Sequence, residues 1–97
     1  MKHTLEDKTL TLYIEGELNS FNSEDIEQEI EDIVSKNDFN AIHVDMAQVT
    51  YISSAGLRII VRLKQRCPDT TLVRVPEEVY AVFEMVGFQN LMNIEKL

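Results

Sequence analysis

The chain has 97 residues, of which 44% are hydrophobic and 27% are charged, a composition typical of one globular domain with a modest core. Nine Lys and Arg residues against 17 Asp and Glu residues give a formal net charge of −8, which argues against binding nucleic acid or anionic lipid through a basic surface. No apolar run reaches the ~20 residues of a membrane span, no apolar stretch resembles a signal peptide, and the lone Cys67 cannot form an internal disulfide. We therefore expect one acidic, cytoplasmic domain over residues 1–97, with no nucleic-acid partner and no direct membrane insertion.

The first elements that the sequence predicts are two strands joined as a hairpin. Residues 9–15 alternate apolar with polar side chains, which is the period of a half-buried strand. Residues 3–5 precede them across a short connection at 6–8. Gly16 is predicted to end the second strand, because an isolated glycine often marks the end of an element.

A helix is predicted next, ending before Asn37. Asn22 stands at its capping position, and Phe21 and Ile26 have the spacing of a hydrophobic staple, in which a residue before the cap packs on the first turn. Acidic side chains follow at the positive end of the helix, where the dipole favours them. The predicted buried face consists of Ile26, Ile30, Ile33 and Val34.

The middle of the chain predicts a strand, a connection and a second helix. Residues 42–46 alternate again, residues 47–54 are expected to form the connection, and the helix is expected from about Ala55 to Arg66, before Pro68. The predicted inward face of the helix consists of Leu57, Ile60, Val61 and Leu63, and the opposite side of Arg58, Arg62 and Gln65.

The last third predicts a strand, a helix and a short closing strand. Residues 72–75 form the strand, Pro76 opens the helix, and Gly87 caps its carboxyl end with Phe88 folding back over it. The predicted buried stripe consists of Val79, Val82, Phe83 and Val86. Residues 91–94 are expected to add the final strand.

Alternating strands and helices imply right-handed crossovers and a largely parallel sheet. Strands covered on both faces usually read as continuous apolar runs, whereas the strands at 9–15 and 42–46 alternate with polar residues. The sequence therefore predicts an α/β fold with a mixed, mostly parallel sheet of four to five strands and helices mainly on one face.

The candidate functional site is the start of the second helix, where Ser53 and Ser54 stand side by side. One serine is explained as a helix cap, which contributes about 1 kcal/mol. Capping does not explain Gly56 inside the first turn, since glycine there costs up to ~1 kcal/mol relative to alanine. We interpret Gly56 as a place where something approaches the backbone closely.

Two chemical interpretations of these serines differ in what they require. A serine nucleophile needs a positioned base and usually a G-x-S-x-G turn, and neither accompanies Ser54. Covalent phosphorylation needs only an accessible hydroxyl, and the start of a helix favours the added negative charge. Arg58, one turn further on, is placed to assist. The chain also lacks a metal-ligand cluster and a phosphate-binding glycine loop, so we expect neither an enzyme nor a cofactor.

At these residues the sequence resembles the STAS domain family, whose pattern is aromatic-apolar-Asp-Ser-(Ser/Thr)-Gly-Leu, in the segment Tyr51–Leu57. Aligned on Gly56, Ser54 falls on the family's phosphoacceptor and Ser53 on its aspartate, while Ala55 replaces the second hydroxyl residue. The segment 16–19 matches the family's Gly-x-Leu-Asp, with Asn19 in place of the aspartate. Residues 79–94 resemble the final helix and closing segment, so the resemblance covers nearly the whole chain.

The resemblance implies a STAS fold and the function of an anti-sigma factor antagonist. Such a protein, when unphosphorylated, binds an anti-sigma factor that is also a serine kinase with a histidine-kinase-like ATPase fold, and thereby releases a sigma factor for transcription. Phosphorylation of the acceptor serine ends the binding, and a PP2C-type phosphatase restores it. The resemblance makes Ser54 the acceptor, with Ser53 as the alternative, and implies these partner contacts: Asn19, Ser20, Asn22, Ser53, Gly56 and Arg58.

Three alternatives stay open at this point. The chain could be a constitutive STAS interaction module, in a lipid-transport complex or a signalling scaffold, without phosphorylation. The acidic first helix and basic second helix are either two solvated faces paired with one another or a basic element presented to a partner. Phe21 and Tyr80 are either exposed contacts or parts of a staple and of the core edge.

Overall fold

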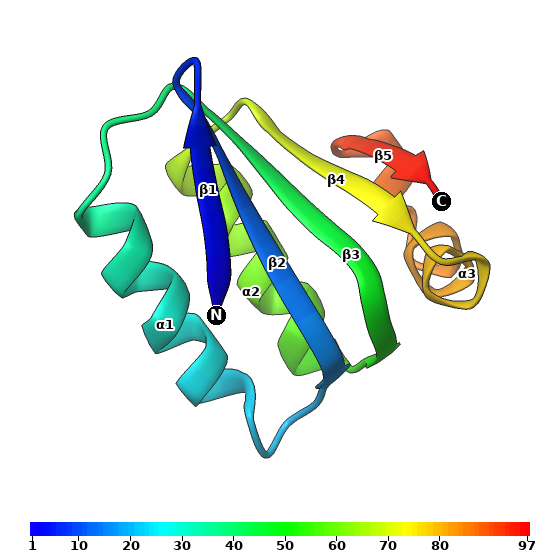
Figure 1. Ribbon diagram of the computed structural model, residues 1–97. Helices are drawn as coiled ribbons and strands as arrows, with labels where there is room; N and C mark the ends of the chain where they lie inside the picture. Colours follow the sequence, from blue (N-terminus) through cyan, green and yellow to red (C-terminus); the bar gives the residue numbers. More distant parts are fainter.

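The five strands of the sheet lie side by side in the order in which they occur in the sequence (Figure 1). In the computed structural model, which describes residues 1–97, the first two strands pair antiparallel and all the others pair parallel. This architecture confirms the predicted α/β class with a mixed, mostly parallel sheet. The strands are β1 (Lys2–Glu6), β2 (Thr9–Leu18), β3 (Ala41–Ile52), β4 (Thr70–Val75) and β5 (Asn93–Lys96). The helices are α1 (Ser23–Ser35), α2 (Ser54–Arg66), α3 (Glu77–Met85) and the short 3-10 turn η1 (Phe88–Asn90).

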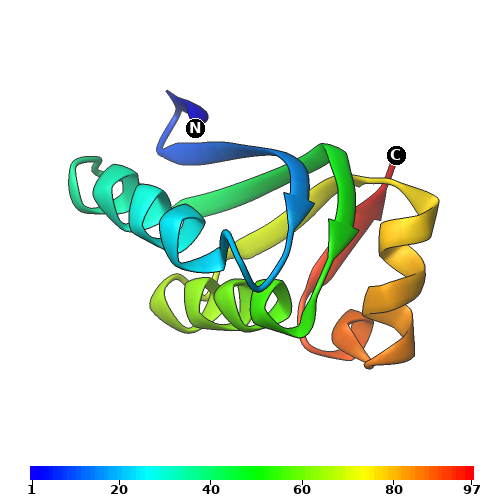
Figure 2. The ribbon, with the colours of Figure 1, turned by 90° about the horizontal axis from the view of Figure 1, so that it is seen from below.

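One core joins the sheet to all three α-helices. α1 and α2 run next to one another on one face of the sheet, and α3 packs toward the β4 and β5 end (Figure 2). Leu12, Val44 and Leu72 occupy neighbouring register positions on this face and are 0% exposed. On the other face, Thr11 and His43 are only half-buried. The structure therefore confirms the prediction from the alternating strands that helices cover the sheet mainly on one face.

β2 and β3 are longer than predicted. The expected end of β2 at Gly16 and the expected connection at residues 47–54 are both wrong, because the two strands stay paired up to Leu18 and Ile52. Gly16 has φ +78° and sits at one of two register shifts in this pairing, so it forms an irregularity within the strand rather than its end. The extension brings the carboxyl ends of both strands to the same edge.

The later elements differ from prediction in small ways. β4 begins two residues earlier and β5 lies at 93–96 instead of 91–94. Gly87 has φ +78° just after α3, and the Phe88 ring stacks on Phe83 with centroids 5.5 Å apart, which confirms the predicted cap and the folding back. Val86 is 49% exposed, because α3 ends one residue before it, so its predicted burial is wrong.

The buried face of α2 is shifted from the prediction. Ile59, Ile60 and Leu63 are buried, whereas Leu57 and Val61 are half-buried. None of the helices has both the length and the apolar composition needed to cross a bilayer.

Candidate interaction site

The two segments that the sequence singled out meet at the carboxyl ends of β2 and β3. The Ser53 backbone N–H donates to the Leu18 carbonyl at 2.8 Å, directly before the connection from β2 to α1. Both ribbon views show this connection beside the turn from β3 into α2 (Figures 1 and 2). The pairing of the two strands thus places residues 19–22 next to the serine pair. Carboxyl ends of parallel strands are the usual place for functional sites in α/β sheets.

Ser53 is the cap of α2. Its backbone is extended, with φ −98° and ψ 175°, and its Oγ accepts a hydrogen bond from the Gly56 N–H at 3.3 Å. Its carbonyl accepts from the Leu57 N–H at 2.9 Å. The capping interpretation therefore applies to this serine. An aspartate, which the family pattern has at this position, would place a carboxylate oxygen in the same capping role.

Ser54 is the first residue of α2 and is exposed. Its hydroxyl makes no hydrogen bond to the rest of the chain, in contrast to the Ser53 hydroxyl. A side chain at this position lies at the positive end of the helix dipole, where negative charge is favoured. Of the two serines, Ser54 is the one whose hydroxyl is free and accessible.

Gly56 is buried beneath this turn. A Cβ atom there would lie 2.7 Å from Leu18 Cγ and 2.8 Å from Ile52 Cγ1, both closer than carbon atoms approach without strain. The close approach expected from the sequence is therefore made by the core of the protein itself. Gly56 shapes the predicted contact surface from below by letting α2 sit against the ends of β2 and β3.

Two asparagines close the connection between β2 and α1. Asn19 Oδ1 accepts from the Phe21 N–H at 2.9 Å and from the Asn22 N–H at 3.0 Å. In return, Asn22 Oδ1 accepts from the Asn19 N–H at 2.9 Å, and Asn22 Nδ2 donates to the Glu17 carbonyl at 2.8 Å. Asn22 is at the predicted cap position of α1, but its side chain holds the loop instead of the helix. Ser20 lies exposed in this loop.

Phe21 projects into solvent from the closed loop. It is 96% exposed, so the predicted hydrophobic staple with Ile26 is wrong. The hydrogen bonds of Asn19 fix the backbone of Phe21 and Asn22, and Ile26 packs against the core without the ring. Of the two interpretations left open for Phe21, an exposed residue or part of a staple, the structure shows the exposed residue. Two asparagines close to a phenylalanine are the sequence signal for this turn, since Asn side chains readily bond backbone N–H groups nearby.

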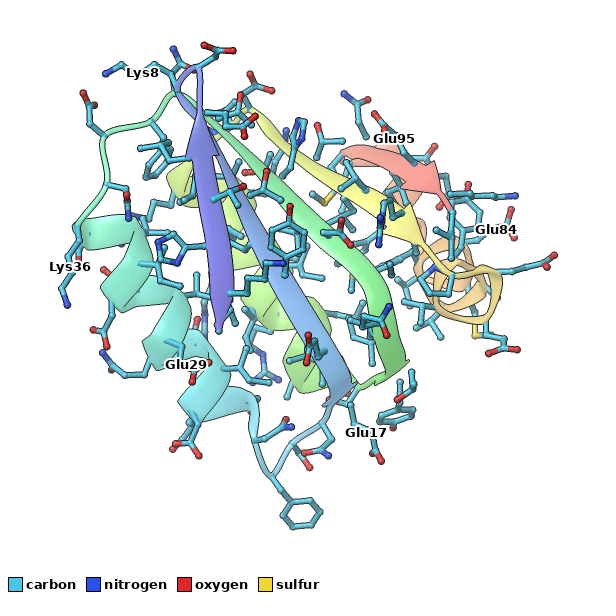
Figure 3. All side chains as sticks on the ribbon, viewed as in Figure 1. Lys8, Glu17, Glu29, Lys36, Glu84 and Glu95 are labelled. Atoms are coloured by element: carbon cyan, nitrogen blue, oxygen red, sulfur yellow. The ribbon has the colours of Figure 1, made fainter.

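Further residues frame this end of the sheet. Glu17 stands near the end of β2 (Figure 3), and its carboxylate lies 3.5 Å from Asn19 Nδ2. Tyr51, opposite Glu17 in the sheet, is 51% exposed. Tyr80 lies elsewhere, half-buried on α3 with Lys96 Nζ 4.4 Å from its ring centre. Of the two aromatic residues whose role stayed open, only Phe21 projects freely.

Two of the four basic side chains of α2 are paired with α1. Arg62 Nη1 lies 2.8 Å from Glu27 Oε1, and Arg66 Nη1 lies 2.6 Å from Glu31 Oε1. Lys64 donates to the Pro68 carbonyl. For Arg62 and Arg66 the interpretation of two mutually paired faces is confirmed.

Arg58 is the arginine of α2 that this pattern leaves out. Each ion pair between the helices joins residues 35 positions apart. The same offset counted back from Arg58 reaches Ser23, which offers no carboxylate. Arg58 is exposed, forms no ion pair, and stands one turn after Ser54. The site therefore carries one unpaired guanidinium beside a free hydroxyl.

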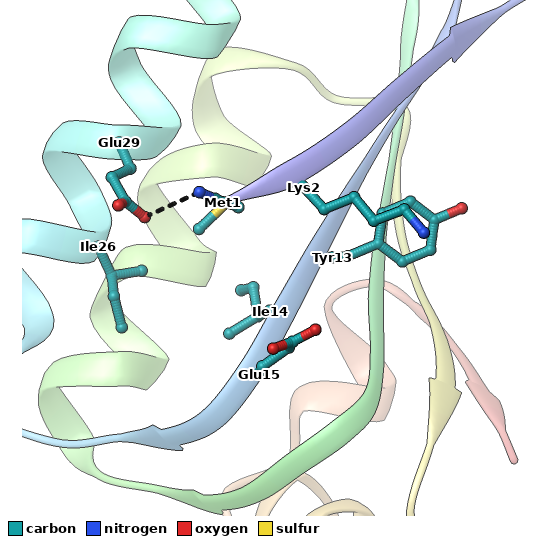
Figure 4. A pocket seen from close by; sticks show the side chains of 7 residues that line it. All are labelled: Met1, Lys2, Tyr13, Ile14, Glu15, Ile26 and Glu29. Atoms are coloured by element: carbon teal, nitrogen blue, oxygen red, sulfur yellow. Dashed lines mark ion pairs between the residues drawn. The ribbon is translucent and has the colours of Figure 1, made fainter.

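A separate hollow of about 370 Å³ opens between β1, β2 and α1 (Figure 4). Met1, Ile14 and Ile26 supply its apolar lining, and the amino group of Met1 lies 3.6 Å from Glu29 Oε2. None of the predicted site residues lines it. No group of three or more His, Cys, Asp or Glu side chains is arranged to hold a metal ion.

Comparison with known proteins places these features in a family context. The STAS domain profile matches residues 2–96. BtrV of Bordetella bronchiseptica, named as a candidate anti-sigma factor antagonist, is 32% identical over 100 residues, spanning 97% of this chain and 85% of BtrV. The anti-sigma-B factor antagonist of Listeria monocytogenes is 21% identical over 92 residues, spanning 91% of this chain and 80% of that protein.

Solved structures share the fold. The crystal structure of an anti-sigma factor antagonist from Mycobacterium paratuberculosis superposes with a TM-score of 0.87 at 16% identity, covering 99% of this chain and 84% of that one. The anti-sigma factor antagonist SpoIIAA in its unphosphorylated form superposes with a TM-score of 0.73 at 19% identity, covering 96% of this chain and 87% of that one. At these identities the likeness concerns the fold alone.

Proposed function

We propose a function from one premise: the chain belongs to the STAS domain family, and its relatives include anti-sigma factor antagonists. In this proposal the unphosphorylated protein binds an anti-sigma factor with serine kinase activity and a histidine-kinase-like ATPase fold. The binding frees a sigma factor for transcription, which takes place in the cytoplasm. Phosphorylation of Ser54 ends the binding, and a PP2C-type phosphatase reverses the modification. The protein itself is a binding partner and a substrate rather than an enzyme.

One observation carries the proposal: Ser54 is exposed with a free hydroxyl, whereas its neighbour Ser53 is committed to the helix cap. A kinase must bring the acceptor oxygen in line with the γ-phosphorus of ATP. The Ser54 hydroxyl is exposed and makes no hydrogen bond that this transfer would break. Phosphorylating Ser53 Oγ would disturb the bond that it accepts from Gly56. The geometry therefore favours Ser54 over Ser53 as the acceptor.

In the proposed transfer, Ser54 Oγ forms a bond to the γ-phosphorus, the bond to the β,γ-bridging oxygen breaks, ADP leaves and the hydroxyl proton is released. The product carries about −1.5 to −2 charge on Ser54. This charge lies at the start of α2, where the helix dipole favours it, and one turn from unpaired Arg58. The modification thus adds charge at one point while the fold stays as it is.

The effect on the partner follows from Arg58. In the unphosphorylated protein, Arg58 is free to pair with an acidic group on the anti-sigma factor. A phosphate on Ser54 competes for the same guanidinium and repels that acidic group. Close charge pairs at interfaces change affinity and association rate strongly, and like charges brought together cost several kcal/mol, i.e. roughly 100-fold or more in binding.

The proposal is tested with the histidine-kinase-like anti-sigma factors encoded in the source genome. Each is purified and mixed with the wild-type chain and ATP, and the labelled residue is located by mass spectrometry. We expect one kinase to label the wild type and Ser53→Ala, but not Ser54→Ala. Labelling that persists in Ser54→Ala would assign the acceptor elsewhere.

Binding supplies the second half of the test. The Ser54→Asp variant is expected to bind the kinase more weakly than the unphosphorylated wild type does. The Ser54→Ala variant is expected to bind it with the affinity of the wild type. If Ser54→Asp binds as tightly as the wild type, the phosphate switch is wrong. A constitutive interaction module in a lipid-transport complex or a signalling scaffold then accounts for the chain.

A further inference from the structure

We infer that Phe21 is an aromatic anchor for the partner, whose surface offers an apolar pocket for the ring and a carboxylate at the pocket rim for Arg58. The inference rests on the proposed function and names the chemistry of the partner surface that this site recognises. It concerns a residue that the resemblance does not include among the partner contacts and whose exposed role the sequence left open.

The exposure of Phe21 has no explanation within the fold. At 96% it is the most exposed large hydrophobic residue of the chain, and the neighbouring Ile26 packs without it. Burying a phenylalanine side chain is favourable by about 1.5–3 kcal/mol, so leaving it in water forgoes that stabilisation. The ring would recover it on entering an apolar pocket.

The loop holds the backbone that carries the ring in a fixed way. Asn19 Oδ1 accepts from the backbone N–H groups of both Phe21 and Asn22. Asn22 Oδ1 accepts from the Asn19 N–H, and Asn22 Nδ2 donates to the Glu17 carbonyl before the loop. A loop closed by its own side chains has little backbone freedom to lose on binding. Aromatic side chains supply much of the affinity at protein interfaces, and a pre-ordered backbone lowers the entropy lost on binding.

A backbone hydrogen bond and the register between α1 and α2 place Phe21 at the same end of the molecule as the serine pair. The carbonyl of Leu18, just before the loop, accepts from the Ser53 N–H. The offset of 35 residues between α1 and α2 sets Arg58 against Ser23, two residues after Phe21. The ring, the guanidinium and the Ser54 hydroxyl therefore lie at one end of the molecule, which a single partner can cover.

Charge complementarity fixes what surrounds the pocket. Arg62 and Arg66 are neutralised by α1, so Arg58 is the guanidinium of α2 open to an outside carboxylate. An apolar pocket alone would hold the ring whether or not Ser54 is phosphorylated. A pocket with an acidic rim near Arg58 makes the same contact sensitive to a phosphate on Ser54.

The test measures binding of unphosphorylated variants to the kinase that labels Ser54, by calorimetry. Phe21→Ala is expected to raise the dissociation constant roughly thirtyfold, the loss of affinity typical of an interface anchor. Phe21→Leu, which keeps an apolar side chain, is expected to lose less. Met85→Ala is the matched control, because Met85 is also highly exposed, at 83%, but lies on α3, away from the loop. The Met85→Ala variant should bind the kinase with the same affinity as the wild type. Equal melting temperatures of the four proteins would show that folding is unaffected.

The outcomes separate the inference from the function on which it rests. If the wild type binds and Phe21→Ala binds within twofold of it, the anchor is refuted while the antagonist function stands. If Met85→Ala weakens binding as much as Phe21→Ala, the loss is not specific to this loop and the anchor is also refuted. If no histidine-kinase-like anti-sigma factor of the source genome binds the wild type, the proposed function fails and the anchor fails with it.

Discussion

Arg62 donates through Nη1 to both carboxylate oxygens of Glu27, at 2.8 and 3.0 Å, and thereby ties α2 to α1. Arg66 repeats the contact with Glu31 one helical turn later. The repeat sets the register of the two helices, and this register places Ser23, which has no carboxylate, opposite Arg58. The distribution of charge at the candidate site is thus a consequence of how the two helices pack.

The double variant Glu27→Gln/Glu31→Gln tests this arrangement. Both pairs are partly exposed, with side-chain exposures of 54% and 36% for Arg62 and Glu27, so solvent screens them. We expect a loss in the free energy of unfolding of no more than about 1 kcal/mol for each pair, measured by urea denaturation at low salt. The difference from the wild type should shrink at 1 M salt, where the Debye length is about 3 Å. A loss that high salt leaves unchanged would contradict an electrostatic origin.

Ser53→Ala tests the division of labour between the two serines. The variant leaves the Gly56 N–H without its side-chain acceptor and should lose about 1 kcal/mol of unfolding free energy. Ser53→Asp restores an acceptor at the cap and should recover most of the loss. Ser54→Ala is the matched control and should unfold like the wild type. Equal losses in Ser53→Ala and Ser54→Ala would show that the cap is shared.

Gly56→Ala tests the contact beneath the site. The added methyl group would meet Leu18 Cγ at 2.7 Å and Ile52 Cγ1 at 2.8 Å, so the helix or these side chains must move. Overpacking of this kind typically costs about 1–3 kcal/mol of unfolding free energy. Adding Ile52→Ala removes the Cγ1 atom that makes one of the two contacts, so the double variant should lose less than the sum of the single losses. Additive losses would mean that the strain lies elsewhere.

The local patterns predicted the elements well because each depends on neighbouring residues. The helix at 55–66 follows from periodicity, and Gly87 followed by Phe88 marks the end of α3. The full length of β2 and β3 could not be predicted in this way. Their pairing continues through the irregularity at Gly16, so it depends on a partner strand far along the chain.

The site was predictable as a pair of segments but not as a surface. The motif around Ser54 and the resemblance at Asn19 pointed to two places in the sequence, and pairing of Leu18 with Ile52 brings them together. The direction of Phe21 depends on which N–H groups Asn19 bonds, a choice that spacing alone does not fix. The isolation of Arg58 depends on the register between two helices, which appears only in the folded protein.

Ser54→Asp and Arg58→Gln together test the electrostatics of the proposed switch without a partner. A carboxylate in the first turn of α2 should raise the free energy of unfolding by about 0.3–1 kcal/mol through the helix dipole. Arg58 adds to this gain if its guanidinium reaches the new charge, since opposite charges four residues apart on a helix attract. The gain should therefore be smaller in the Arg58→Gln background, as measured by urea denaturation at low salt. An equal gain in both backgrounds would remove Arg58 from the switch.

Asn19 tests whether the loop depends on the side-chain oxygen or on the amide as a whole. In Asn19→Ala the N–H groups of Phe21 and Asn22 lose their acceptor, and their hydrogen exchange should speed up about fivefold, the effect of losing roughly 1 kcal/mol. Asn19→Asp keeps an oxygen at the same place, as the aspartate of the family pattern does, and should exchange like the wild type. Amide exchange followed by NMR reports both residues directly, with the Ile30 amide inside α1 as an internal reference. If Asn19→Asp exchanges as fast as Asn19→Ala, the oxygen is not what holds the loop. Fixed presentation of Phe21 would then need another cause.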